Sequence, residues 1–201
     1  GKFLVVRSDV MSFALTGKYN LTEIGSVIQQ SIQPYYALSS KPNTDTIDDY
    51  DFRMSGQIVN GPLLKVFMPT LERIEPIKIN GRFATGQGFT TSVHAPLLVM
   101  GANRIQELKM NVATTPNALQ LRTSLEQLSA GGTLNIYSSS INADVANNAV
   151  NFLVNLRDQQ NINKYGFGGL FQQPDSGRFT LHLDPEVLLL NYDKWVVAAD
   201  N

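Results

Sequence analysis

The sequence contains no cysteine, one tryptophan, two histidines and no long hydrophobic run. The lack of cysteine excludes disulfides, thiolate metal sites and cysteine nucleophiles. No stretch approaches the ~20 apolar residues of a membrane-spanning helix. The 16 lysines and arginines nearly balance the 17 aspartates and glutamates, so no charge excess indicates nucleic acid as a partner. Net charge therefore indicates no particular class of partner.

Few residues are suited to catalysis or metal binding. His94 and His182 both fall on the polar side of alternating segments, with no acidic residue at a metal-ligand spacing. The serines at 138–140 have no histidine close in sequence, and no spacing pairs an acid with a base. The glycines of 81–88 lack the strand-loop-helix order and the lysine of a phosphate-binding loop. We therefore expect no enzyme activity, no metal site and no cofactor.

Alternation of apolar and polar residues with a period of two is the dominant signal, and it is typical of a sheet with one buried face. Turn signals such as those at 85–88, 114–117 and 174–177 separate the alternating segments. This order predicts a mainly β fold, built as an antiparallel meander. Its apolar side chains include Met11, Phe13, Leu15, Phe52, Met54, Ile79, Phe83, Leu121, Ile136, Phe152, Val154, Phe167, Phe171, Phe179, Leu181 and Leu183.

An amphipathic helix is predicted over residues 21–34, where the period changes to 3.6. Asn20 or Thr22 can cap its start, and Pro34 closes it. The predicted apolar face of the helix consists of Ile24, Val27, Ile28 and Ile32. We expect this face to lie on the apolar side of the sheet.

Three other segments have a distinct character. Residues 60–69, with Pro62 near the start and Pro69 at the end, fit one or two helical turns. Residues 39–49 are polar and predict a loop. Residues 177–197 predict a strand with one apolar face, a bend and then a second, almost wholly apolar strand.

The apolar face of so many strands needs a cover, and a helix of about 16 residues spans only ~24 Å. The sheet can fold on itself as a sandwich. Alternatively, it can curve into a groove that holds the helix, lipid or a neighbouring repeat. The alternation alone does not choose between these two arrangements.

Three stretches of the sequence resemble the large envelope proteins of the TamB family, the translocation and assembly module subunits of the AsmA-like superfamily. They are "RSDVMSFALTGKYN", "DFRMSGQIVNGPLLKVFMP" and "FTLHLDPEVLLLNYDKW". The likeness rests chiefly on the join between strand and helix at 17–21 and on the phrase at 184–195. It implies a long curved antiparallel sheet, open along one side and apolar within. Residues 1–201 would then form one β-groove segment of a longer, inner-membrane-anchored periplasmic protein.

The resemblance also implies a function in outer-membrane biogenesis. Such proteins are thought to guide phospholipid toward the outer membrane, or to help an outer-membrane β-barrel partner in the assembly and translocation of other proteins. The partners would be phospholipid acyl chains and flanking repeats of the same parent chain. The groove would be lined by the apolar residues named above together with Trp195, and covered in part by the helix. Two alternatives are a structural or adhesive β-sandwich and a stand-alone periplasmic lipid-binding chaperone.

Overall fold

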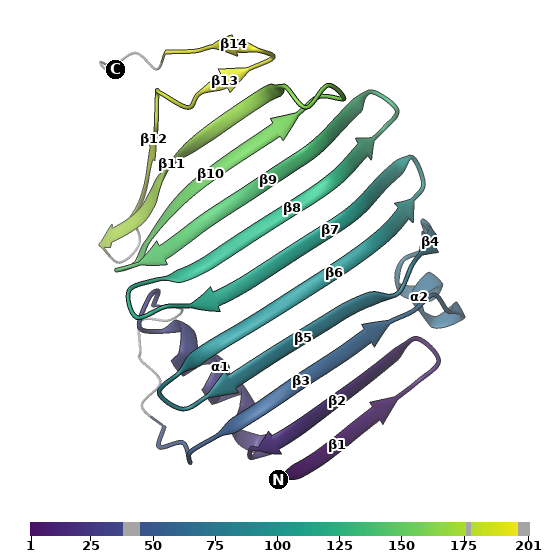
Figure 1. Cartoon of the computed structure of the whole chain (residues 1–201), viewed down its shortest axis with the longest axis vertical. Coiled ribbons are helices and arrows are strands. Elements are labelled where there is room, and N and C mark those ends of the chain that lie inside the picture. The colour runs from purple at the N-terminus through teal and green to yellow at the C-terminus, as the bar shows by residue number, and fades with distance from the viewer. Residues whose placement is uncertain (38–44, 176–177, 197–201) are drawn as a thin grey trace.

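One curved antiparallel sheet makes up most of the molecule (Figure 1). The computed structural model describes residues 1–37, 45–175 and 178–196. It is 62% strand and 10% helical, and its 14 strands form a single sheet that does not close into a barrel. The strand order is β1-β2-β3-β5-β6-β7-β8-β9-β10-β11-β13-β14, with β4 on β6 and β12 on β11. The prediction of a mainly β, antiparallel meander is confirmed.

The elements have the following bounds. The strands are β1 (Lys2–Arg7), β2 (Met11–Lys18), β3 (Asp51–Ile58), β4 (Leu71–Ile74), β5 (Ile77–Ala84), β6 (Gly88–Met100), β7 (Asn103–Thr114), β8 (Leu119–Ala130), β9 (Leu134–Ala146), β10 (Ala149–Arg157), β11 (Asn163–Asp175), β12 (Arg178–Leu183), β13 (Leu189–Leu190) and β14 (Asp193–Lys194). The helices are the 3₁₀ turn η1 (Leu21–Glu23), α1 (Ile24–Ile32) and α2 (Pro62–Phe67).

The C-terminal stretch differs from the expectation of two strands. Strand β12 is present, but the second apolar strand is replaced by β13 and β14, which have two residues each. Asn191 and Tyr192, between them, have φ of 52° and 74°. Two left-handed residues in succession make a tight hairpin turn, which interrupts the strand that the apolar run predicts.

The 3₁₀ turn η1 and helix α1 together cover residues 21–32 of the predicted helical segment 21–34. The Asn20 carboxamide oxygen accepts hydrogen bonds from the Thr22 N–H (3.3 Å) and the Thr22 hydroxyl (3.0 Å). The Asn20 side-chain N–H donates to Glu23 (2.7 Å), which fixes the first turn. In Figure 1, α1 passes behind β3, β5 and β6. The predicted amphipathic helix is therefore present and lies on one face of the sheet.

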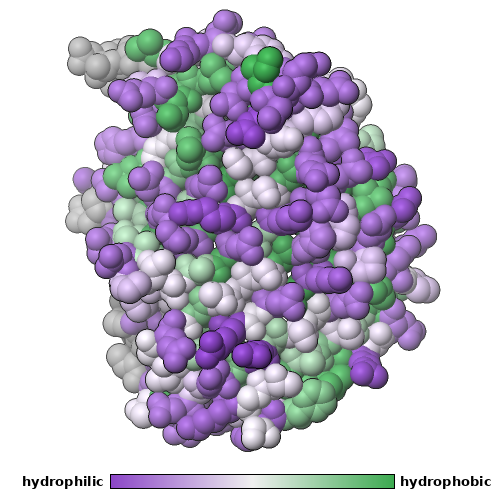
Figure 2. All heavy atoms as spheres, viewed as in Figure 1, coloured by the Kyte–Doolittle hydropathy of each residue, from purple (hydrophilic) through white to green (hydrophobic). Residues whose placement is uncertain are grey.

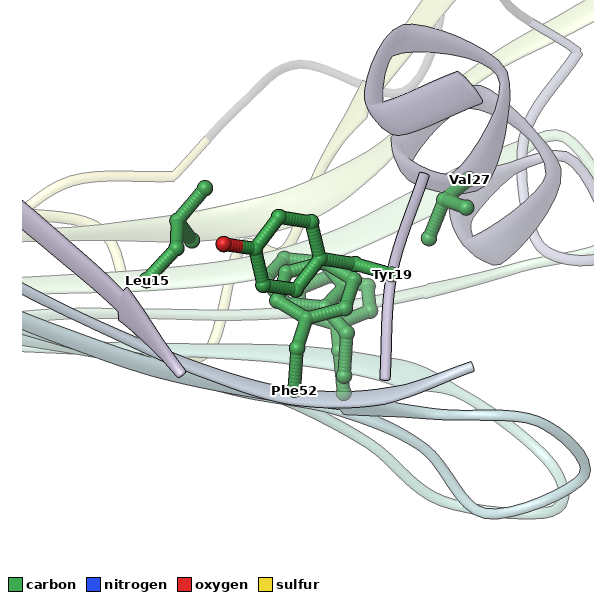
Figure 3. Close-up of a cluster of buried hydrophobic side chains, with 6 residues drawn as sticks. Leu15, Tyr19, Val27 and Phe52 are labelled. Atoms are coloured by element: carbon green, nitrogen blue, oxygen red, sulfur yellow. The ribbon is translucent and has the colours of Figure 1, made fainter. Parts of the chain in front are cut away.

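An aromatic cluster joins α1 to the sheet (Figure 3). The Phe52 ring stacks on Phe83 with centroids 5.2 Å apart, and Phe83 stacks on Phe89 at 5.0 Å. The Tyr19 ring meets Phe52 edge-on at 6.0 Å. Val27 points from the helix down toward these rings and is 3% exposed. Helix and sheet thus share one hydrophobic core over β2 to β6.

The chain after α1 is tied to turns far away in the sequence. The Tyr35 hydroxyl donates to the Thr115 carbonyl (2.7 Å) in the turn between β7 and β8. The Asn148 N–H donates to the Tyr35 carbonyl (3.0 Å), and the Ala37 N–H donates to the Asn148 side-chain oxygen (2.7 Å). These three bonds, which we call the tether, hold residues 35–37 against the turn between β7 and β8 and the turn between β9 and β10.

The predicted polar loop 39–49 is described only in part, since residues 38–44 lie outside the described residues. Asp45 accepts hydrogen bonds from the Ser26 hydroxyl (3.1 Å) and, through its carbonyl, from the Gln30 side chain (2.7 Å). Ile47 packs against the aromatic cluster. The described part of the loop therefore lies along α1.

Candidate functional site: the apolar face of the sheet

Three rows of directly paired residues run across the sheet on the side that carries α1, and we call them together the apolar face. Direct partners in neighbouring strands point to the same side, so each row shares one face. The first row is Leu4, Leu15, Met54, Gly81, Thr91, Val112, Leu121, Ala143, Phe152, Gly169 and Leu183. Strand alternation places the other two rows on the same face.

The second and third rows flank the first. The second row contains Phe52, Phe83, Phe89, Thr114, Leu119, Val145, Val150, Phe171 and Leu181. The third contains Val6, Phe13, Gly56, Ile79, Val93, Met110, Thr123, Ile141, Val154 and Phe167. Threonine is the only polar residue type in these rows, so the face is almost wholly apolar.

The opposite face of the sheet is polar. Figure 2 shows this face, with hydrophilic side chains over most of the strands. Its ion pairs include Arg122–Asp144 (2.7 Å) and Arg82–Asp51 (3.2 Å). His94 Nε2 lies 2.9 Å from a Glu107 carboxylate oxygen, and this hydrogen bond holds the pKa of Glu107 below its ordinary value. The sheet is thus a single layer that is polar on one side and apolar on the other.

Helix α1 covers only part of the apolar face. Over β2 to β5, Leu15, Phe52 and Phe83 are 2–4% exposed. Over β9 to β12, which we call the open half, Ala143 and Val154 are only 8% and 7% exposed, but the exposed fraction rises to 39% for Ile141 and to 56% for Leu181 in β12. The open half therefore presents apolar side chains to solvent, as large exposed patches at binding sites do.

A pocket of about 610 Å³ lies where η1 and α1 meet the ends of β2 and β3. Its apolar floor comprises Tyr19, Val27, Ile47 and Phe52, and charged residues of both signs line it as well: Lys2, Lys18, Glu23, Asp48 and Asp49. The pocket lies at the covered end of the apolar face.

Most of the predicted lining residues lie together on the apolar face. The rows contain Phe13, Leu15, Phe52, Met54, Ile79, Phe83, Leu121, Phe152, Val154, Phe167, Phe171, Leu181 and Leu183. Met11 extends them through its pairing with Ile58. Phe179 joins them by stacking on Phe171, with centroids 5.4 Å apart. On the helix, Val27 is buried, and Ile24 and Ile32 pack against the aromatic cluster.

Three predicted residues lie elsewhere. Ile136 lies two residues before Ser138, whose φ of 40° interrupts the alternation; it is 3% exposed and pairs with Leu128 outside the three rows. Trp195 follows β14, belongs to no register row and is 54% exposed. The prediction that Ile28 lies on the sheet is wrong, because Ile28 is 41% exposed. Successive helical residues are about 100° apart, so a helix with Val27 directed at the sheet turns Ile28 toward the margin of the contact.

The sequence reasoning missed apolar residues near both ends of the covered region. Leu4 and Val6 in β1 belong to the rows, but the run "FLVV" does not alternate and so gave no strand signal. Tyr19, at the end of β2, is 6% exposed and closes the aromatic cluster. A tyrosine just before a helix cap carries no period by which to assign it to a face.

The C-terminal hairpin is anchored beside the open half by Asp158. Its carboxylate accepts hydrogen bonds from the N–H groups of Ile162 (2.9 Å) and Gln160 (3.0 Å) and from the Tyr192 hydroxyl (2.8 Å). These bonds, that from Ile162 foremost, hold the pKa of Asp158 below its ordinary value of 3.8. The same contact raises the pKa of Tyr192.

Acid should release this hairpin. Because the pKa of Asp158 is lowered by folding, its ionised form stabilises the fold above pH 3.8, and this contribution is lost as the pH falls through the lowered pKa. Trp195, directly after β14, should report the release as a change in fluorescence as the pH falls below 3.8. Asp158→Asn should remove this transition. A transition of unchanged midpoint in that variant would show that another group controls the hairpin.

Neither a metal site nor a membrane-spanning helix is found in the described part of the chain. No group of three or more histidine, aspartate or glutamate side chains there is arranged to hold a metal ion. Among the same residues, no helix has both the length and the hydropathy that a bilayer crossing requires.

No protein-family model, no curated protein and no solved structure matches the chain.

Proposed function

We propose that this chain is a section of an envelope protein that holds phospholipid acyl chains on its apolar face and lets them move along it. The observation that carries the proposal is the open half, where apolar rows continue beyond the cover that α1 provides. Leu181 and Leu183 are 56% and 41% exposed there. A stable soluble domain gains nothing from such exposure, whereas a carrier of apolar cargo requires it.

The apolar rows would let a bound acyl chain slide along the sheet. Each methylene that leaves water gains ~0.8 kcal/mol without any directional bond, so a bound chain can shift along the face at little cost. With about 4.8 Å between strands, a row that crosses eleven strands is about 48 Å long. An acyl chain in one leaflet spans roughly 15 Å, half of the hydrocarbon core. The face therefore offers several successive positions to one chain.

The resemblance to the TamB family fits this arrangement. Its three phrases fall on β2, on β3 with α2, and on β12 to β14. In this proposal the chain is a periplasmic segment of a longer protein anchored in the inner membrane of a Gram-negative envelope. Flanking repeats extend the apolar face, and an outer-membrane β-barrel is a further partner. Support for outer-membrane protein assembly is then a second use of the same face.

The other functions considered from the sequence have less support. A structural or adhesive sandwich needs a second sheet over the apolar face, and the described residues form one sheet. A stand-alone lipid chaperone needs an enclosed cavity, whereas the open half faces solvent. We therefore favour the conduit section over either alternative.

A charge on the open half should abolish acyl binding. Leu181→Arg places a guanidinium among apolar side chains on the row, and we expect at least tenfold weaker binding of a fluorescent fatty acid by delipidated, detergent-free protein. His182→Arg is the matched control, because His182 pairs with Leu170 on the polar face. Circular dichroism should show that both variants are folded. Equal binding by the two variants would refute the proposal.

A further inference from the structure

Helix α2 is an exposed apolar protrusion that the proposed acyl binding does not use. The exposed fractions are 51% for Leu63, 72% for Val66, 81% for Phe67 and 36% for Met68. None of the six residues of α2 is buried. A cluster of large apolar side chains left in water marks an interaction surface.

The protrusion is held at both ends. Before α2, the Val59 N–H donates to the Val10 carbonyl (2.9 Å) in the turn between β1 and β2. After α2, the Gly101 N–H donates to the Thr70 carbonyl (3.0 Å). Leu71, which follows, is 3% exposed. Helix α2 is thus presented from a fixed base, at the strand ends opposite those that α1 covers (Figure 1).

The charge of this segment is distinctive. Between residues 59 and 71, Lys65 is the only charged residue, and no acidic residue is present. Lysine can extend its ammonium group to lipid phosphates while its stem lies along apolar surface. Exposed leucine, valine and phenylalanine side chains can insert into the headgroup region of a bilayer, and one lysine beside them adds attraction to an anionic surface.

The small size of the protrusion favours a bilayer over a protein partner. A specific protein interface buries about 800 Å² on each side, with 20–30 residues of each partner. Four side chains on a six-residue helix supply only a small part of that surface. A bilayer interface needs no shape complementarity, because lipid adapts to the inserted side chains. We infer that α2 is a membrane-contact element that inserts Leu63, Val66 and Phe67 into the surface of an anionic phospholipid bilayer.

This contact stands apart from acyl binding on the apolar face, because the two use different residues at separate places in the fold. Where both operate, α2 brings one margin of the sheet to the membrane surface. Lipid leaving the bilayer would then have a short path to the apolar face.

Vesicle sedimentation tests the inference. The chain of residues 1–201 should sediment with vesicles of phosphatidylethanolamine and phosphatidylglycerol, and Phe67→Glu should reduce the bound fraction at least tenfold. Phe3→Glu is the matched control, because Phe3 is 71% exposed but lies in β1, and it should bind like the unmodified protein. Lys65→Glu should weaken binding to these anionic vesicles more than binding to vesicles of phosphatidylcholine alone.

Two variants separate this inference from the proposed function. Leu181→Arg should lose fatty-acid binding yet still sediment with vesicles, and Phe67→Glu should show the reverse. Vesicle binding that survives in Phe67→Glu would overturn the inference. So would a protein that ignores vesicles and forms dimers that Phe67→Glu dissociates in analytical ultracentrifugation, since α2 would then be a contact between copies.

Discussion

Replacing Phe52 by alanine should lower the free energy of unfolding by about 3–5 kcal/mol. Phe52 is 2% exposed beneath α1, where its ring stacks on Phe83 and meets Tyr19 edge-on. Removing its ring leaves a cavity that the sheet below cannot fill, because a strand cannot shift without breaking its hydrogen bonds. For a chain of this size the melting temperature should fall by about 10 °C.

Phe179→Ala is the control for this loss. Phe179 also stacks on another ring, that of Phe171, but it is 59% exposed. Its removal leaves no cavity, so the expected cost is about 1 kcal/mol, chiefly from the aromatic pair. Chemical denaturation of both variants measures the difference. Equal losses would mean that the cluster under α1 is no better packed than the open half.

Val27→Asp should detach α1 from the sheet. Val27 is 3% exposed and faces the rings of the aromatic cluster, so its replacement buries a carboxylate with no partner among apolar atoms. We expect a loss of about 4 kcal/mol or more, either as global destabilisation or as release of the helix. Release would uncover the apolar face over β2 to β6 and raise the binding of a hydrophobic dye such as ANS.

The neighbouring residue provides the comparison for Val27. Ile28→Asp introduces the same charge into the same helix, but Ile28 is 41% exposed, and the expected cost is below about 1 kcal/mol. Thermal denaturation and dye binding should therefore separate the two variants clearly. If both variants behaved alike, the orientation of α1 on the sheet would have to be different.

Alternation was sufficient to predict the sheet because most strands expose one side to water. In β2 the pattern around Phe13 and Leu15 identifies both the strand and its apolar side. Strand β1 was missed because Phe3 and Val5 face the polar side while Leu4 and Val6 face the other, so no period exists. The position of Ile136 could not be predicted, because no residue type around Ser138 indicates that Ser138 has a positive φ.

How the elements pack against one another also could not be predicted from the sequence. The periodicity of α1 marks a broad apolar face, but only docking on β3 and β5 selects Val27 over Ile28 as the buried residue. The choice between sandwich and single layer depends on how far the sheet curves, which no local pattern records. For α2, the prolines predicted the helix, whereas its exposure depends on which elements the fold places beside it.

The tether implies an order of events during folding. Neighbouring strands of the meander are mostly consecutive in sequence, so the sheet can grow by local hairpins with small loop-closure cost. The tether instead joins Tyr35 to Thr115 and Ala37 to Asn148, which are 80 and 111 residues apart. Helix α1 forms early from local contacts, but its final position requires the turn between β9 and β10 to exist. We expect docking of α1 to be the last step, so the aromatic strip of Phe52, Phe83 and Phe89 stays exposed longest and is the surface that a chaperone would have to shield.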